Sequence, residues 1–458
     1  MTLELDRSDA KEPTPLRSAG GDAETALILA CVRAALPVRD KEQTPNLIPI
    51  AETIDWDHLI SLSERQGVLP MVYQALRTLP AGDGSILPPE PISEQLWERF
   101  HGNVMRSMTL GMELVKIVGA LQAAGVRVLP VKGVALAAQV YTDPTARQPG
   151  DLDLLIAPPD YGTTLAVLED TGYTAHSPAT MSQRQEAAWL HFRIERHFRQ
   201  PQQRIDLDLH WQLFSQRILA LDFDALWARG ATVRLRDRTL RTLGVEDMLL
   251  YLCFHGSKHG WDALKWLVDV AMVLHGYADL DWVVVLARAD ALESRRMVLA
   301  GMALVREILG VELPDEIQRA ISQDPALPTL VEAGQESLMM RLTPQRAPVH
   351  RGAADAGQPL ATPQKPARSV RENLEARYRL APMWTNMRLL RHQERGALRN
   401  TLHRFVSVMT PGAQEIRMAS LPRPFFFVYY LLRLGRIVMN ATSRARILRS
   451  KSPRRLPR

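Results

Sequence analysis

The chain has 458 residues, of which 46% are hydrophobic and 23% are charged, and its formal net charge is +6. This length and composition predict a globular protein of two or three domains with real cores. Cys31 and Cys253 both lie in apolar runs of helical appearance, which excludes a disulfide framework and a CxxC metal site. The polar N-terminus predicts no signal peptide, and no run reaches the ~18 to 20 apolar residues of a membrane span. We therefore expect a cytoplasmic protein.

The first part of the chain is predicted to be helical. Residues 1–22 are polar and are expected to be disordered. From residue 23, apolar residues recur at helical spacing, with a break near Gly67 and Pro70, until Gly125 provides a helix stop. Residues 23–125 are therefore expected to form a helical N-terminal region.

The pattern then changes to short strands that alternate with helices. We expect strands in VRVLPVKG and DLDLLIA, helices in VALAAQVY and YGTTLAVLEDTGY, and an antiparallel hairpin formed by HFRIERHFRQ and RIDLDLHWQL. Residues 126–215 thus form a compact α/β unit. Residues 216–342 are expected to be a helical C-terminal region, 343–370 a Pro/Ala/Gly-rich linker and 371–458 a basic tail. The predicted fold class is α+β, a small mixed-sheet core flanked by helical regions.

The positive charge is concentrated in the tail. Residues 371–458 contain 19 Lys or Arg and 4 Glu, so the rest of the chain is acidic. Within the tail, LPRPFFFVYYLLRLGRIVMNA is apolar but interrupted by Arg433 and Arg436. Two readings are equally favoured: a helix lying on an anionic membrane surface at the inner face, apart from the body, or a helix docked on the body. Nucleic-acid binding is less favoured, because no recognisable nucleic-acid fold accompanies the basic residues.

Asp151 and Asp153 stand two residues apart in the strand DLDLLIA. Alternate residues of a strand point to the same face about 6.5 to 7 Å apart, so the two carboxylates are neighbours. Their repulsion is tolerable where both face solvent or where a cation lies between them. A hard divalent ion such as Mg²⁺ prefers such oxygen ligands. The pair predicts a metal site, and an exposed edge strand is the alternative.

A second acidic face lies on RIDLDLHW, which alternates strictly. Asp206, Asp208 and His210 share one side of this strand, and the other side is wholly apolar. A hairpin turn centred near Gln202 would place Glu195 opposite Asp208 and His197 opposite Asp206. A shared metal site would neutralise this acidic face, and an exposed polar face is again the alternative.

The segment VLPVKGVALAAQVY joins a strand to a helix at Lys132 and Gly133. Backbone N–H groups at a helix start bind phosphate, glycine allows close approach and lysine adds charge. Arg147, four residues before Asp151, is a further candidate phosphate contact or else a surface arginine.

Together these segments resemble the uncharacterised nucleotidyltransferase family of the polymerase-β-like nucleotidyltransferase superfamily. The resemblance covers about residues 50–310 and lies in VLPVKG, GDLDLLI, DLHW at 208–211, HGSKHGW and LKWLVD, in that order. It implies that Asp151 and Asp153 are the paired catalytic metal ligands and that Asp208, rather than Asp206, is the third carboxylate. Lys132 and Gly133 stand where most of the superfamily has Gly-Ser, so the resemblance does not define the exact triphosphate contacts.

The resemblance implies a nucleotidyltransferase that uses two Mg²⁺ or Mn²⁺ ions to transfer a nucleoside monophosphate from an NTP to an unknown acceptor hydroxyl. Two alternatives belong to other classes. One is a catalytically silent nucleotidyltransferase-like module that binds nucleotide or a partner. The other is a membrane-surface adaptor that acts through the basic tail.

Downstream, Lys258 and His259 are candidate nucleotide contacts if the helical region closes over the sheet. His255 and His259 have the i, i+4 spacing of two zinc ligands, but no HExxH glutamate is present. Packing at a helix end is the alternative for both histidines. Trp261 and Trp266 could stack on a base, although core packing is the commoner role of tryptophan.

Overall fold

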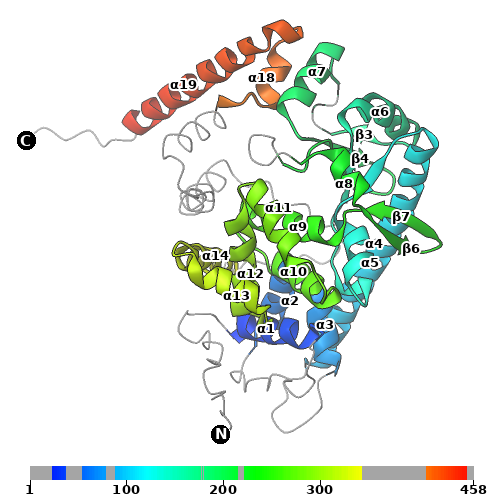
Figure 1. Cartoon of the computed structure of the whole chain (residues 1–458), viewed down its shortest axis with the longest axis vertical. Coiled ribbons are helices and arrows are strands. Elements are labelled where there is room, and N and C mark those ends of the chain that lie inside the picture. Colours follow the sequence, from blue (N-terminus) through cyan, green and yellow to red (C-terminus); the bar gives the residue numbers. More distant parts are fainter. Residues whose placement is uncertain are drawn as a thin grey trace, which may run out of the picture. The chain divides into compact units, whose positions relative to one another are not determined.

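The computed structural model describes residues 23–37, 54–78, 88–176, 178, 180–214, 221–342 and 409–450, with side chains to 439 in the last range (Figure 1). The predicted disordered start, the linker at 343–370 and most of the basic tail lie outside these residues. The chain divides into two units: residues 1–108, 137–149 and 245–392 form unit 1, and residues 109–136, 150–244 and 393–458 form unit 2. Each unit therefore draws on several of the predicted regions, whose boundaries remain predictions.

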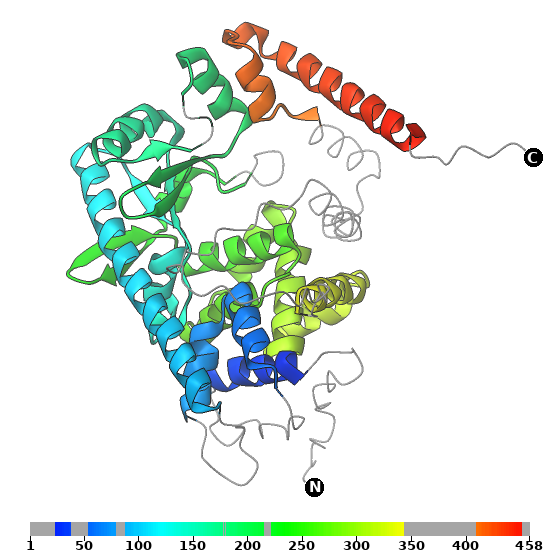
Figure 2. The same cartoon turned by 180° about the vertical axis from the view of Figure 1, so that it is seen from behind.

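The described part of unit 1 is helical. Helix α4 belongs to unit 1 as far as Met108, continues into unit 2, and is one unbroken helix in Figure 2. Helix α5 also crosses from one unit to the other. The helices that lie wholly or partly in unit 1 are α1 (Ala23–Ala35), α2 (Trp56–Gln66), α3 (Leu69–Thr78), α4 (Glu90–Ala123), α5 (Gly133–Val140), η3 (Pro144–Ala146), α9 (Val245–His259), α10 (Leu264–Gly276), α11 (Trp282–Ala291), α12 (Arg295–Leu309), α13 (Asp315–Gln323) and α14 (Leu327–Leu342).

Unit 2 is built around a five-stranded mixed sheet and confirms the mainly helical α+β class. Its remaining elements are β1 (Val128–Pro130), β2 (Leu152–Ile156), η4 (Pro158–Asp160), α6 (Tyr161–Asp170), β3 (Thr174–Ala175), α7 (Gln183–Phe192), β4 (Glu195–Gln200), β5 (Ile205–His210), α8 (Phe223–Ala228), β6 (Ala231–Leu235), β7 (Arg238–Thr242), α18 (Ala413–Met418), η5 (Arg423–Phe425) and α19 (Phe427–Ser450). The strand order is β1-β2-β5-β4-β3, and only β2 and β5 run parallel.

The strand pattern explains which residues face the site. All five residues of β2 are buried, as expected of a central strand. In β5, Ile205, Leu207 and Leu209 are fully buried on one face, which leaves the acidic residues on the other. The predicted separation of an apolar and an acidic face is thus confirmed.

The hairpin of β4 and β5 has a different register from the expected one. Glu195 pairs with His210 and His197 pairs with Asp208, a shift of two residues. The turn lies one residue later than expected because Arg204 adopts a φ of 54° and the Gln203 N–H donates to the Gln200 side chain. A shift of two preserves the faces, so the same side chains still point to the site.

A second, two-stranded sheet, β6 and β7, lies where we expected helix. Val233 pairs with Leu240, and both are buried. The sequence ATVRLRDRTLRT alternates apolar or β-branched residues with arginine, which is a strand pattern. The expectation of helix throughout 216–342 is therefore wrong for this hairpin.

The C-terminal segment packs on α7 within unit 2. Phe192 of α7 makes ring contacts with Phe426, Tyr429 and Tyr430 at centroid distances of 5.6 to 5.8 Å. Figure 1 shows α18 (orange) beside α7 (green). The docked alternative is thus the one the structure supports for this segment. In the described residues, no helix has the length and apolar character to cross a membrane.

Candidate metal centre

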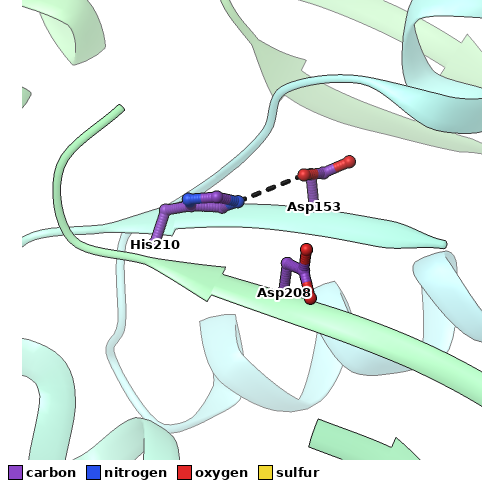
Figure 3. A group of neighbouring side chains, drawn as sticks. All are labelled: Asp153, Asp208 and His210. Carbon is purple, nitrogen blue, oxygen red and sulfur yellow. Dashed lines mark hydrogen bonds and ion pairs between the residues drawn. The ribbon is translucent and has the colours of Figure 1, made fainter. Parts of the chain in front are cut away.

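Asp153 and Asp208 lie side by side on the two parallel strands of the sheet. Asp153 is the second residue of β2, Asp208 is the fourth residue of β5, and the two are direct register partners. Figure 3 shows both carboxylates on the same face, with the His210 ring reaching toward Asp153. Because partners in adjacent strands share a face, the pairing itself brings the acids together.

Asp153 is buried and bound by two cationic or polar groups. Its Oδ1 lies 2.9 Å from the Lys132 Nζ and 3.1 Å from the His210 Nε2. Burial alone would raise the pKa of Asp153, but the Lys132 ammonium and the His210 hydrogen bond hold the pKa well below its usual range. Asp153 is only 3% exposed and β2 lies between β1 and β5, so the alternative of an exposed edge strand is wrong for this residue.

Asp208 is half-buried and contacts a different histidine. The Asp208 Oδ1 lies 2.5 Å from the Nδ1 of His197, its partner on β4. This hydrogen bond raises the pKa of His197, the effect of burial opposes it, and the charges of Asp208 and Glu195 add to the rise. The two acids of the site thus differ: one is deep and ion-paired, and the other is accessible.

Asp153, Asp208 and His210 together fit a metal ion. One ligand atom from each lies within 4.8 Å of the others, so an ion with metal–ligand distances of about 2.1 Å would bind all three once these side chains close in slightly. Two carboxylates and an imidazole are a donor set typical of divalent metals. The ion would have to compete with the Lys132 ammonium for Asp153.

Asp151 lies just before β2 and is half-buried. Its carbonyl oxygen would be 3.0 Å from a Cβ placed on Gly133, whose φ is +59°. Only glycine fits both the left-handed backbone and this close approach. The start of α5 therefore lies directly against the Asp151 backbone. The metal contact expected of the Asp151 side chain stays a prediction.

Arg147 forms an ion pair with the buried carboxylate of Asp269 in unit 1. Its Nε and Nη2 donate to the two oxygens of Asp269 at 2.8 and 3.0 Å, and the Tyr141 hydroxyl donates to the same carboxylate at 2.7 Å. Asp269 is 1% exposed. This geometry favours a structural role, and the predicted phosphate contact of Arg147 remains untested.

Lys258 and His259 end α9 in unit 1, and both are exposed. The rings of His255 and His259 lie 4.6 Å apart, and each contacts the Trp266 ring. Trp261 is 3% exposed and fills space that a Cβ on Gly256 would enter, which is core packing. A zinc-type cluster at these histidines is not found among the described side chains.

The sequence placed His210 on the acidic face of its strand, but neither His210 nor Glu195 was named as a site residue. The Glu195 Oε2 lies 3.2 Å from the His210 Nδ1, although the pair lacks hydrogen-bond geometry. The Asp-Leu-His spacing at 208–210 could have indicated His210, because alternate strand residues share a face. Glu195 could be found only with the correct hairpin register.

In comparisons with known proteins, the chain matches the sequence profile of one family. The profile of a family described as "uncharacterised nucleotidyltransferase" matches residues 52–310, more than half of the chain, and confirms the resemblance inferred from the sequence. No curated protein and no solved structure matches.

Proposed function

Starting from the fact that the chain belongs to the uncharacterised nucleotidyltransferase family, we propose that it transfers a nucleoside monophosphate from an NTP to an acceptor hydroxyl. The observation that carries the proposal is the direct pairing of Asp153 with Asp208 beside His210. Two carboxylates that meet across parallel strands concentrate negative charge at one point, which a divalent cation would balance.

Bound divalent ions would supply charge neutralisation of the triphosphate and a lowered pKa of the acceptor hydroxyl. Asp153 and Asp208 would hold these ions, with Asp151 as a further ligand on the edge of the site. The acceptor oxygen would form a bond to the α-phosphorus while the bond to the pyrophosphate oxygen breaks. The chain's own contribution is therefore positioning and fixed charge.

Lys132 and Gly133 would contact the triphosphate from the start of α5. The Lys132 side chain is 18% exposed and already lies at the site through Asp153. With Asp153 engaged in metal binding, the Lys132 ammonium would be available to pair with phosphate oxygens. Arg147, Lys258 and His259 belong to unit 1, and we keep them as candidate nucleotide contacts only.

The test is incubation of the purified protein with Mg²⁺ or Mn²⁺ and each labelled NTP, followed by assay of pyrophosphate and labelled acceptor. Asp153→Asn and Asp208→Asn should abolish turnover. Asp206→Asn is the matched control, because Asp206 is an exposed carboxylate of the same strand and lies 3.8 Å from Arg199. Tight nucleotide binding without turnover would favour a catalytically silent module instead.

A second proposal concerns α19, which presents an apolar row to solvent. Phe427, Leu431, Leu434 and Val438 recur at helical spacing and are 45 to 60% exposed. Seven Lys or Arg and no acidic residue follow within 444–458. We propose that this row and the basic end bind an anionic membrane surface. Co-sedimentation with phosphatidylserine vesicles tests it: Leu431→Ser with Leu434→Ser should abolish binding, and unchanged binding would refute it.

A further inference from the structure

His210 is placed to act as a ligand rather than as a packing residue. It is the last residue of β5 and is 5% exposed, yet its ring lies on the carboxylate face of the sheet (Figure 3). Its Nε2 points at the Asp153 oxygen, and Asp208 lies two residues before it on the same face. An ion that binds both carboxylates would thus be within reach of this nitrogen.

Glu195 is placed to fix the protonation pattern of the His210 ring. The two residues are register partners across β4 and β5, and the Glu195 Oε2 lies 3.2 Å from the His210 Nδ1. The Nδ1 atom is buried and has no hydrogen-bond partner in the described structure, so Glu195 is the acceptor placed nearest to it by the sheet register. When Nε2 exchanges its Asp153 contact for a metal ion, the ring proton would reside on Nδ1, where the Glu195 carboxylate lies within reach to accept it.

The donor set has a consequence for the identity of the metal. Mg²⁺ takes oxygen ligands almost exclusively, whereas the divalent ions of the first transition series also accept imidazole, Mn²⁺ being the weakest binder of that series and the one nearest to Mg²⁺ in its preference for oxygen. We infer that His210 ligates the metal through Nε2, that Glu195 is its positioning residue, and that the site prefers Mn²⁺ over Mg²⁺. This inference rests on the proposed function, because it concerns the same metal site.

His197 is the competing nitrogen donor and provides the internal control. Its Nδ1 contacts the Asp208 Oδ1, but its side chain is 48% exposed and lies on the accessible side of the site. If His197 were the ligand, removal of His210 would leave the nitrogen signal in place. The two histidines can therefore be separated by substitution one at a time.

The experiment measures metal binding directly on the full chain, with no nucleotide present. Titration calorimetry should give at least tenfold tighter binding of Mn²⁺ than of Mg²⁺. Pulsed electron paramagnetic resonance of the Mn²⁺ complex should show modulation from a directly bound ¹⁴N. His210→Asn should remove this modulation and most of the Mn²⁺ preference, whereas His197→Asn should retain both. Glu195→Gln should weaken Mn²⁺ binding about tenfold with His210 still present, which covers the case that His210→Asn fails to fold.

The outcomes separate this inference from the proposed function. Mn²⁺ binding that Asp153→Asn abolishes, but that shows no ¹⁴N modulation or keeps it in His210→Asn, overturns the His210 assignment and leaves the nucleotidyltransferase site standing. Equal affinity for Mg²⁺ and Mn²⁺ overturns the preference. Absence of any divalent binding at millimolar concentration overturns both.

Discussion

Lys132 and Asp153 form an ion pair at 2.9 Å inside the candidate metal centre, so this site contains its own cation. The pair joins the segment that follows β1 to the second residue of β2, and the Val131 N–H donates to the Asp153 carbonyl beside it. Removal of either partner therefore acts on folding and on ligand binding at once. Loss of Asp153 should weaken metal binding, whereas loss of Lys132 should strengthen it. Stability and metal affinity can be measured separately in each variant.

Asp153→Asn should destabilise the metal-free protein more than Asp208→Asn does. Asp153 is buried between Lys132 and His210, and loss of its charge breaks a buried ion pair with the ammonium, which costs about 3 kcal/mol. Asp208 is half-buried, and its loss costs about 1 kcal/mol or less. Urea unfolding of both variants measures the difference, with Asp206→Asn as control. Equal stabilities of the Asp153 and Asp208 variants would contradict the placement of Asp153.

Lys132→Met should strengthen metal binding and weaken NTP binding. The ammonium competes with a divalent ion for the Asp153 oxygen, and a charged hydrogen bond is worth about 1.5 to 3 kcal/mol, so metal affinity should rise tenfold or more. The same change removes a positive charge from the triphosphate. Calorimetry with Mn²⁺ alone and then with NTP measures each effect. Lys116→Met is the control, because Lys116 is 49% exposed and pairs with Glu113 instead. Weaker metal binding in the Lys132 variant would contradict the competition.

Arg147→Gln should destabilise unit 1 strongly. The guanidinium is 11% exposed and holds both oxygens of buried Asp269, and a broken buried pair costs about 3 to 5 kcal/mol. A double-mutant cycle with Asp269→Asn should show strong coupling, because the second change removes the charge that the first leaves unpaired. A normal stability of Arg147→Gln with reduced NTP affinity would instead restore the phosphate-contact assignment.

The sequence indicated which residues of each strand face the site, but it did not indicate which strands pair with each other. Alternation in RIDLDLHW placed Asp208 and His210 on one face because strand geometry has a period of two. Which strands become neighbours depends on contacts far apart in sequence, so the direct pairing of Asp153 with Asp208 could not be read locally. The internal partner Lys132 was missed for a related reason: a lysine at a helix start looks the same in sequence whether it faces phosphate or a carboxylate.

Tyr141 predicts a specific loss of stability at alkaline pH. Burial raises the pKa of the Tyr141 hydroxyl, and the charge of Asp269 raises it further, well above the usual value. The unfolded chain ionises its tyrosines near pH 10, so the native state then binds more protons than the unfolded state and its stability falls as pH rises. Stability measured from pH 8 to 11 should fall less steeply in Tyr141→Phe. The same slope in both proteins would show that Tyr141 ionises normally.

A chain that ends at Leu342 should be less stable in unit 2 and prone to aggregation. Phe192 of α7 is 8% exposed and contacts the rings of Phe426, Tyr429 and Tyr430, so truncation would return apolar surface to water at about 25 cal/mol per Å². The Gln185 side chain would also lose its contact with the Ile416 carbonyl. A chain that ends at Met439 keeps these contacts and lacks the last basic residues, so it should unfold like the full protein. Thermal unfolding and light scattering of the three chains measure this difference. A soluble Leu342 chain of normal stability would show that the C-terminal helices act apart from the sheet, as the first reading of the tail supposed.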